Sequence, residues 1–381
     1  MQPDKTSNCL DLAAFTAKLD AAGARWSQRK QQLEDQLTRM PVALFGYGGK
    51  GRSLAHHIRR HASAEIAIFD SAPDKRALAA EAGFKTIDSL EDLVQGPWLS
   101  ILGACQAQIQ QKHSISNPHM FFQEAACLFG APHFAHCASD FGRYVAAHVT
   151  DLYAVYQALH GASRERFLHV LCFRLSSDPI DLTTTRAPST EMWLDIPNRY
   201  RRRPYQTVLD VGAYDGDTLV EFSLRFAPER GIAVEANHDL FDAIRSAGER
   251  YAQGIKVIPM AAWSRNTRLK FEEVRFGMIQ VTESPEGMLE AAPIDAAVTE
   301  RVDFLKMDIE GAEAEALTGC EELLRRWLPD LAIAAYHRPE DIVSIWRQIN
   351  AFGYSSQDFS FHFGHYSDCL DDSILYVCKA V

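Results

Sequence analysis

Three carboxylates lie close together in one glycine-containing segment of the chain. Residues 209–218 read LDVGAYDGDT and contain Asp210, Asp215 and Asp217. Gly212 has no Cβ atom, so the backbone there can pass close to a ligand. Three negative charges would repel a phosphate, whereas they would attract a cofactor with a cationic end. S-adenosylmethionine, which carries an ammonium and a sulfonium group, meets this requirement.

A fourth carboxylate, Glu235, ends an apolar run at residues 231–235. When such a run is the second strand of a cofactor-binding unit, an acidic residue at its end can accept hydrogen bonds from both ribose hydroxyls. NAD-dependent enzymes use the same device, so only the combination with the acidic first loop favours S-adenosylmethionine. Two structural alternatives stay open: Asp210 as a helix N-cap and Glu235 as an ordinary carboxylate at a strand end.

A second group of reactive side chains follows two later apolar runs. Lys306, Asp308 and Glu310 lie at the end of the first run, and His337 lies at the end of the next. Methyl transfer needs an aligned acceptor and, for a hydroxyl, removal of its proton. We therefore expect these four residues to be catalytic, with Asp308 or His337 as the general base.

The same acidic pair offers a metal site. Asp308 and Glu310 could hold Mg²⁺, which prefers oxygen ligands and would lower the pKa of an acceptor hydroxyl. The sequence identifies no third ligand. The alternatives are that Glu310 stabilises the start of a helix and that Lys306 only neutralises Asp308.

A glycine-rich turn near the N-terminus is a separate candidate site. Residues 46–51 read GYGGKG, follow an apolar run and precede a predicted helix, as in the G-x-G-x-x-G fingerprint of dinucleotide-binding units. An acidic residue about 20 positions further on is part of that fingerprint. A unit used only for packing or dimerisation is an equal alternative. The residues of this second nucleotide site would be Gly46, Gly48, Gly49, Gly51 and Asp70.

The elements that must position these residues alternate between strands and helices in two stretches of the chain. Short apolar runs separated by helical patterns predict parallel sheets of the doubly wound kind. We therefore expect an α/β protein of four parts: an N-terminal helical segment at 1–40, a Rossmann-like nucleotide-binding half-domain at 41–112, a mostly helical connector or cap at 113–203, and a cofactor-binding domain at 204–381.

The last of these parts resembles the FkbM-type methyltransferase family. The resemblance rests on four segments in the right order: DVGAYDGDT at 210–218, VEAN at 234–237, FLKMDIEGAE at 304–313 and the pair Tyr336-His337. It implies a class I methyltransferase fold, which is Rossmann-like with a mostly parallel seven-stranded sheet. It also implies S-adenosylmethionine as the methyl donor and O-methylation of a sugar or natural product.

The resemblance also implies which residues bind the cofactor. Asp210, Gly212 and Glu235 would contact it, and the strand ending at Ala261 and Ala262 would lie near the adenine. The segment before the domain is similar to that of longer family members, in which an aromatic residue occupies the position of Trp193. With the neighbouring motif residues, the expected cofactor-binding set is Asp210, Gly212, Ala213, Tyr214, Asp215, Asp217, Thr218, Glu235, Ala236, Asn237, Ala261 and Ala262.

The charge of the chain argues against nucleic acid as a partner. Its 50 acidic and 39 basic residues leave a net charge of -11, and an acidic chain has no long-range attraction to phosphate backbones or anionic lipid. The sequence has neither an apolar signal segment at its start nor an apolar run of about 18 residues. We therefore expect a cytoplasmic protein without membrane partners, and sheet edges that would allow a homodimer.

These observations favour an S-adenosylmethionine-dependent methyltransferase that acts on a hydroxyl of a small sugar-like, nucleotide-linked or natural-product acceptor. Two other functions stay open. One is an NAD(P)-dependent oxidoreductase that uses the N-terminal glycine-rich turn, although no hydride-transfer constellation accompanies that turn. The other is a non-catalytic protein that binds a nucleotide or S-adenosylmethionine.

Overall fold

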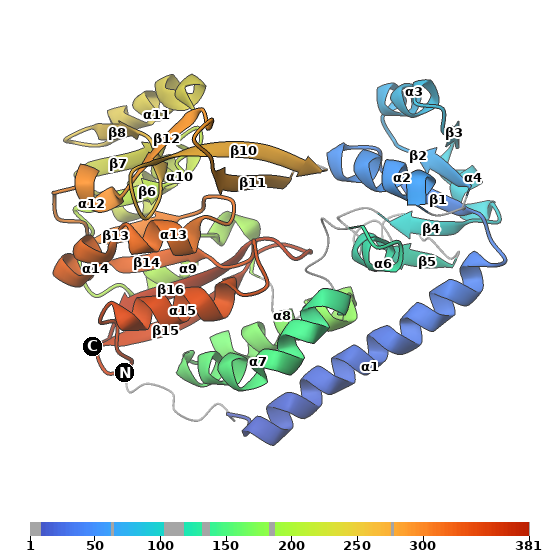
Figure 1. Ribbon diagram of the computed structural model, residues 1–381, viewed down its shortest axis with the longest axis horizontal. Coiled ribbons are helices and arrows are strands. Elements are labelled where there is room, and N and C mark those ends of the chain that lie inside the picture. The colour runs from blue at the N-terminus through green and yellow to red at the C-terminus, as the bar shows by residue number, and fades with distance from the viewer. Residues whose placement is uncertain are drawn as a thin grey trace.

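The computed structural model describes residues 9–61, 65–102, 118–131, 138–182, 187–275 and 278–380. It contains an α/β unit near each end of the chain, with a helical segment between them (Figure 1). Two successive sheets of mainly parallel strands confirm the α/β fold class. No helix in the described part of the chain is long and apolar enough to cross a membrane.

Helix α1, Leu12–Leu37, links the two units. Asp11 caps its start by accepting a hydrogen bond from the backbone N–H of Ala14. Phe15, near the start, is buried in a core that continues into the C-terminal unit, whereas Leu33, near the end, is buried in the core of the first sheet. The helix therefore packs against both parts of the molecule (Figure 1).

The first sheet has five parallel strands in the order β3-β2-β1-β4-β5. Its fifth strand lies within the segment expected to be the connector, so the sheet extends beyond residue 112, a boundary that itself lies outside the described residues. A strand of three residues is too short to give a periodic pattern. The elements are β1 (Val42–Phe45), α2 (Gly49–His61), β2 (Ile66–Phe69), α3 (Pro73–Glu81), β3 (Lys85–Thr86), α4 (Leu90–Gln95), β4 (Leu99–Leu102), β5 (His119–Phe121) and α6 (Phe122–Leu128).

The segment between the sheets is mostly helical from residue 138 on, as expected. Its helices are α7 (Ala138–Ala158), α8 (Ser163–Ser176) and α9 (Asp195–Tyr200), with 3-10 turns at Pro179–Asp181 and Ser189–Glu191. Helix α8 packs against α1, α7 and the edge strand β15 (Phe359–His365). The connector is therefore fixed to the C-terminal sheet along that edge (Figure 1).

The second sheet has seven strands in the order β15-β16-β14-β13-β6-β7-β8, as the resemblance implies. Only β16 runs antiparallel to its neighbours. The central strands are buried on both faces, which explains why they are continuous apolar runs in the sequence. Besides β15, the elements are β6 (Thr207–Val211), α10 (Asp217–Phe226), β7 (Arg230–Glu235), α11 (Phe241–Ala247), β8 (Ile255–Pro259), β13 (Phe304–Met307), α13 (Glu313–Thr318), α14 (Glu321–Trp327), β14 (Asp330–Ala334), α15 (Asp341–Ala351) and β16 (Ser373–Lys379).

A third, smaller sheet was not expected from the sequence. It has the order β11-β10-β12-β9 and lies between β8 and β13 in the chain. The run at 255–262, expected to be one strand, is divided between two sheets, because the chain turns after Pro259. Its elements are β9 (Ala261–Ala262), β10 (Thr267–Arg275), β11 (Met278–Glu283), β12 (Leu289–Ala292) and the short helix α12 (Ile294–Ala297).

The glycine-rich turn of the first sheet gives a testable packing constraint. A Cβ atom added at Gly51 would lie 2.0 Å from the backbone oxygen of Gly46, whereas one added at Gly48 would meet nothing within 4 Å. Gly51→Ala should therefore destabilise the protein by about 1–3 kcal/mol, although alanine is the better helix former. Denaturant unfolding followed by circular dichroism measures this, and Gly48→Ala is the control. Equal stability of the two variants would mean that the turn is not packed as described.

Candidate active site

A cavity of about 830 Å³ lies at the carboxyl ends of the central strands of the second sheet. Strands β6, β7 and β13 and their following loops form its floor, and the small sheet supplies Leu269, Val281 and Leu289. Open α/β sheets bind ligands at this edge. These three apolar side chains were not predicted from the sequence, because they belong to the strands of the unexpected small sheet.

Most of the expected cofactor-binding residues line this cavity. Asp210 and Ala213 are buried and lie outside the lining, and Asp215 instead accepts a hydrogen bond from the backbone N–H of Asp217. The residues that line it are Gly212, Tyr214, Asp217, Thr218, Glu235, Ala236, Asn237, Ala261 and Ala262.

Asp210 and Lys306 pair with each other beneath the cavity. Lys306 Nζ lies 2.9 Å from Asp210 Oδ1 and donates a hydrogen bond of 2.7 Å to the backbone oxygen of Gly212. Burial raises the pKa of Asp210 to about 6, while Lys306 acts in the opposite direction. Lys306 lines the cavity, but its ammonium group is held by these two partners. The pair therefore fixes the loop after β6.

Gly212 is the point at which that loop crosses the end of β13. It has a φ of +80°, and a Cβ atom there would lie 2.0 Å from the backbone oxygen of Asp308. No larger residue fits without a shift of one loop or the other. Gly212 thus sets the distance between the loop after β6 and Asp308.

Glu235 is oriented at the end of β7 by two backbone donors. Its Oε2 accepts a hydrogen bond of 3.0 Å from the N–H of Tyr214, and its Oε1 accepts one of 2.8 Å from the N–H of Asn237. Each carboxylate oxygen can accept further hydrogen bonds, because it has more than one lone pair. The side chain lines the cavity and is thus able to receive two ligand hydroxyls.

The connector closes the cavity from a distant part of the sequence. Trp193 lines it, and Lys306 Nζ lies 5.3 Å from the centre of the indole ring. The tryptophan has a φ of +68°, which is unusual for a residue other than glycine, and its backbone N–H donates to the hydroxyl of Tyr376. The connector therefore contributes directly to the site.

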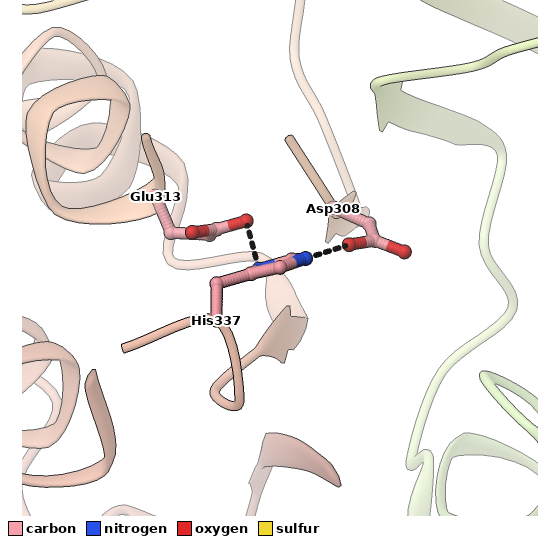
Figure 2. A group of neighbouring side chains, drawn as sticks. All are labelled: Asp308, Glu313 and His337. Carbon is pink, nitrogen blue, oxygen red and sulfur yellow. Dashed lines mark ion pairs between the residues drawn. The ribbon is translucent and has the colours of Figure 1, made fainter. Parts of the chain in front are cut away.

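Asp308, Glu313 and His337 lie side by side (Figure 2), and Glu310 also lies near His337. Asp308 and Glu310 line the cavity. His337 Nε2 lies 3.6 Å from Asp308 Oδ1 and 3.7 Å from Glu310 Oε2, and Nδ1 lies 3.1 Å from Glu313 Oε1. Glu313 is fully buried and also accepts the backbone N–H of Ile309. Glu313 belongs to the segment at 304–313, but no role for it could be predicted from the sequence, because its contact with His337 depends on the fold.

The charges in this cluster favour a protonated imidazole. Burial alone would lower the pKa of His337, but its hydrogen bond to Glu313 and the charges of Glu313, Asp308 and Glu310 raise it to about 9. Burial raises the pKa of Glu310, against the effect of His337. At neutral pH His337 is therefore a poor proton acceptor in the ligand-free protein, which leaves Asp308 as the better of the two expected bases.

In the expected second nucleotide site, Asp70 and Lys50 make contacts with other groups of the protein. Asp70 is buried, and its carboxylate accepts backbone N–H groups of Tyr47 at 2.7 Å and Ala72 at 2.9 Å. It thus closes its own turn. Lys50, in the same turn, reaches the C-terminal unit and forms an ion pair of 2.8 Å with Asp371. Nucleotide binding at Gly46–Gly51 stays a prediction.

His337 makes the stability of the protein depend on pH. Because its pKa is higher in the folded chain than in the unfolded one, its contribution is complete below about pH 6.5 and is lost as the pH rises through about 9. The stability difference between wild type and His337→Gln should therefore shrink by up to about 3 kcal/mol between about pH 6 and pH 10. Urea unfolding in the presence of EDTA measures it. A difference that does not change with pH would contradict the ion-pair network.

Comparisons with known proteins agree with this geometry. The family model of the methyltransferase FkbM domain matches residues 210–356, whereas the chain has no match among the curated proteins. The crystal structure of methyltransferase FkbM from Methylobacillus flagellatus KT aligns with a TM-score of 0.72 and 20% identity, over 96% of this chain and 100% of that one.

Other solved structures are similar only in part. A putative rRNA-methylase from Clostridium thermocellum aligns over 52% of this chain and 98% of its own, with 9% identity and a TM-score of 0.35. Spermidine synthase from Thermotoga maritima aligns over 50% of this chain and 58% of its own, with 13% identity and a TM-score of 0.33. The methyltransferase FkbM domain model thus matches residues 210–356 of this chain, and the Methylobacillus protein shares its fold.

Proposed function

We propose that the protein transfers a methyl group from S-adenosylmethionine to a hydroxyl oxygen of a small acceptor that is sugar-like, nucleotide-linked or a natural product. The observation that carries the proposal is one cavity with two chemically different walls. Glu235 and its neighbours at the end of β7, here called the cofactor wall, line it together with Asp308 and Glu310 after β13, here called the acceptor wall. Such an arrangement lets a cofactor and an acceptor meet in a single site.

The cofactor wall suits the parts of S-adenosylmethionine. Glu235 presents a fixed carboxylate for two ribose hydroxyls. Ala261, Ala262 and Leu269 offer an apolar surface for the adenine ring. Asp217 places negative charge on the same wall, where a cationic amino-acid end of the cofactor would be attracted. These residues would hold the cofactor, which supplies a methyl group activated by its sulfonium charge.

The acceptor wall suits a hydroxyl that must lose a proton. Asp308 Oδ1 faces His337, and its other oxygen points away from the ring (Figure 2). That free oxygen is our candidate proton acceptor. The hydroxyl O–H bond breaks with the proton moving to Asp308, and the acceptor oxygen forms a C–O bond to the methyl carbon as the C–S bond breaks. The Tyr336 hydroxyl, which donates to Asp308 Oδ1 at 3.3 Å, holds the carboxylate in position.

The contact between the two units supports a nucleotide-linked acceptor among the three classes. Lys50 belongs to the glycine-rich turn, and its partner Asp371 lies in the loop between β15 and β16. The next residue, Asp372, has its pKa raised to about 6 by burial and by Asp371 and Asp308. The turn therefore lies beside the loop between β15 and β16, and a nucleotide bound to the turn would place an attached sugar on the side of that loop.

Replacing Glu235 tests the cofactor site. Glu235→Ala should weaken binding of S-adenosylhomocysteine about 10- to 150-fold, because charged hydrogen bonds of about 1.5–3 kcal/mol are lost. Isothermal titration calorimetry measures the affinity. Glu221→Gln removes an exposed charge from α10 and should bind like wild type. Unchanged affinity in Glu235→Ala would place the cofactor elsewhere.

Replacing Asp308 separates catalysis from cofactor binding. Asp308→Asn should keep the affinity for S-adenosylhomocysteine within about threefold and lower methyl transfer about 10²- to 10⁴-fold, the range of a general base. Transfer of labelled methyl groups from S-adenosylmethionine to a panel of hydroxylated sugars and nucleotide sugars gives the rate. Full activity of the variant would rule out Asp308 as the proton acceptor.

A further inference from the structure

The imidazole of His337 lies near the carboxylates of Asp308 and Glu310, at distances close to those between two ligands of one metal ion. Two ligand atoms bound to one ion at about 2.1 Å lie about 3.0–3.4 Å apart in octahedral or tetrahedral sites. The Nε2 atom of His337 lies 3.6 Å from Asp308 and 3.7 Å from Glu310. In both pairs the distance is within a few tenths of an ångström of the spacing between two ligands of one ion.

The other side of the imidazole ring is arranged as in known metal centres. A metal-bound histidine usually donates its second ring nitrogen to a carboxylate, which fixes the tautomer and the ring orientation. Here Nδ1 of His337 faces Glu313 at 3.1 Å, so Nε2 points to Asp308 (Figure 2). The donor atoms of Asp308, Glu313 and His337 all lie within 4.8 Å of one another.

Glu313 gives an independent sign that a positive charge belongs in this cluster. Its side chain is fully buried, and its Oε2 atom has no hydrogen-bond partner. A buried carboxylate needs compensation by charge or by hydrogen bonds. His337 is its ion-pair partner, and the same imidazole also faces two further carboxylates. A divalent cation at Nε2 would compensate Asp308 and Glu310 and leave the imidazole N–H to Glu313.

We infer that Asp308, Glu310 and His337 Nε2 bind a first-row divalent transition-metal ion, with Mn²⁺ the best fit, and that Glu313 positions His337 from behind. The ligand set decides the ion, because Mg²⁺ prefers oxygen ligands alone whereas an imidazole favours transition metals. The pair expected from the sequence, Asp308 and Glu310 with Mg²⁺, is thus extended by a third ligand and changed in its metal.

The ion has a function in the proposed reaction, on which this inference rests. Asp308 and Glu310 line the cavity, so the ion would have open positions towards the acceptor. An acceptor hydroxyl that coordinates it becomes a stronger acid and more readily gives its proton to Asp308. The ion changes no oxidation state, and the bonds broken and formed are those of the methyl transfer.

Electron paramagnetic resonance tests the site without an activity assay. The full chain is treated with EDTA, transferred to metal-free buffer and titrated with MnCl₂, and the signal of free hexaaqua Mn²⁺ reports binding. We expect one site per chain. Glu310→Gln and His337→Gln should each weaken the affinity at least tenfold, and Glu313→Gln about 10- to 100-fold, as for residues that orient a ligand. Excess Mg²⁺ should displace Mn²⁺ poorly.

Two controls make the result decisive. Asp242→Asn removes a carboxylate on α11 that is 97% exposed and pairs with Arg245, and it should bind Mn²⁺ like wild type. Glu310 is 60% exposed, so Glu310→Gln is not a core substitution and should fold, which circular dichroism verifies. Absence of saturable Mn²⁺ binding, or binding that Glu310→Gln and His337→Gln leave unchanged, would overturn the metal site.

The same samples separate this inference from the proposed function. Calorimetry with S-adenosylhomocysteine in EDTA measures the cofactor site alone. If the cofactor analogue binds and Mn²⁺ does not, the metal site is wrong and protonated His337 alone neutralises the carboxylates. If Mn²⁺ binds at these residues and the cofactor analogue does not bind, the metal site stands and the methyl transfer fails.

Discussion

The buried ion pair between Asp210 and Lys306 is the interaction on which the site depends. The two residues lie opposite each other on the adjacent central strands β6 and β13, and both are almost fully buried. Removing one partner of such a pair leaves an uncompensated buried charge, which costs about 3–5 kcal/mol. Lys306 also holds the carbonyl of Gly212. One ammonium group therefore joins the strand that leads to Asp308 to the loop that lines the cofactor wall.

The order of the strands on either side of this pair determines where the two walls of the cavity lie. Parallel strands bring their carboxyl ends to one edge, so β6 and β7 place Gly212 and Glu235 there while β13 and β14 place Asp308 and His337. The close approach of Gly212 to Asp308 then fixes the distance between the two sets. Trp193 from the connector and apolar side chains of the small sheet complete the lining of the cavity at this edge.

The sequence predicted those features that depend on local pattern. Buried parallel strands are apolar runs, and residues such as Glu235, Asp308 and His337 come directly after them, so their common edge could be predicted. It did not predict that Asp210 pairs with Lys306 beneath the cavity, because that depends on the register of two strands almost a hundred residues apart. The role of Glu313 and the small sheet of β9–β12 were not predicted for the same reason. Their partners are distant in sequence or lie on other elements.

The most direct test of the account is a crystal structure of the protein grown with S-adenosylhomocysteine. We expect the ribose hydroxyls to lie within hydrogen-bond distance of Glu235, the adenine to pack near Ala261 and Ala262, and the sulfur to face Asp308. A ligand bound at the Gly46–Gly51 turn instead, or an empty cavity beside β6 and β7 at saturating concentration, would contradict it.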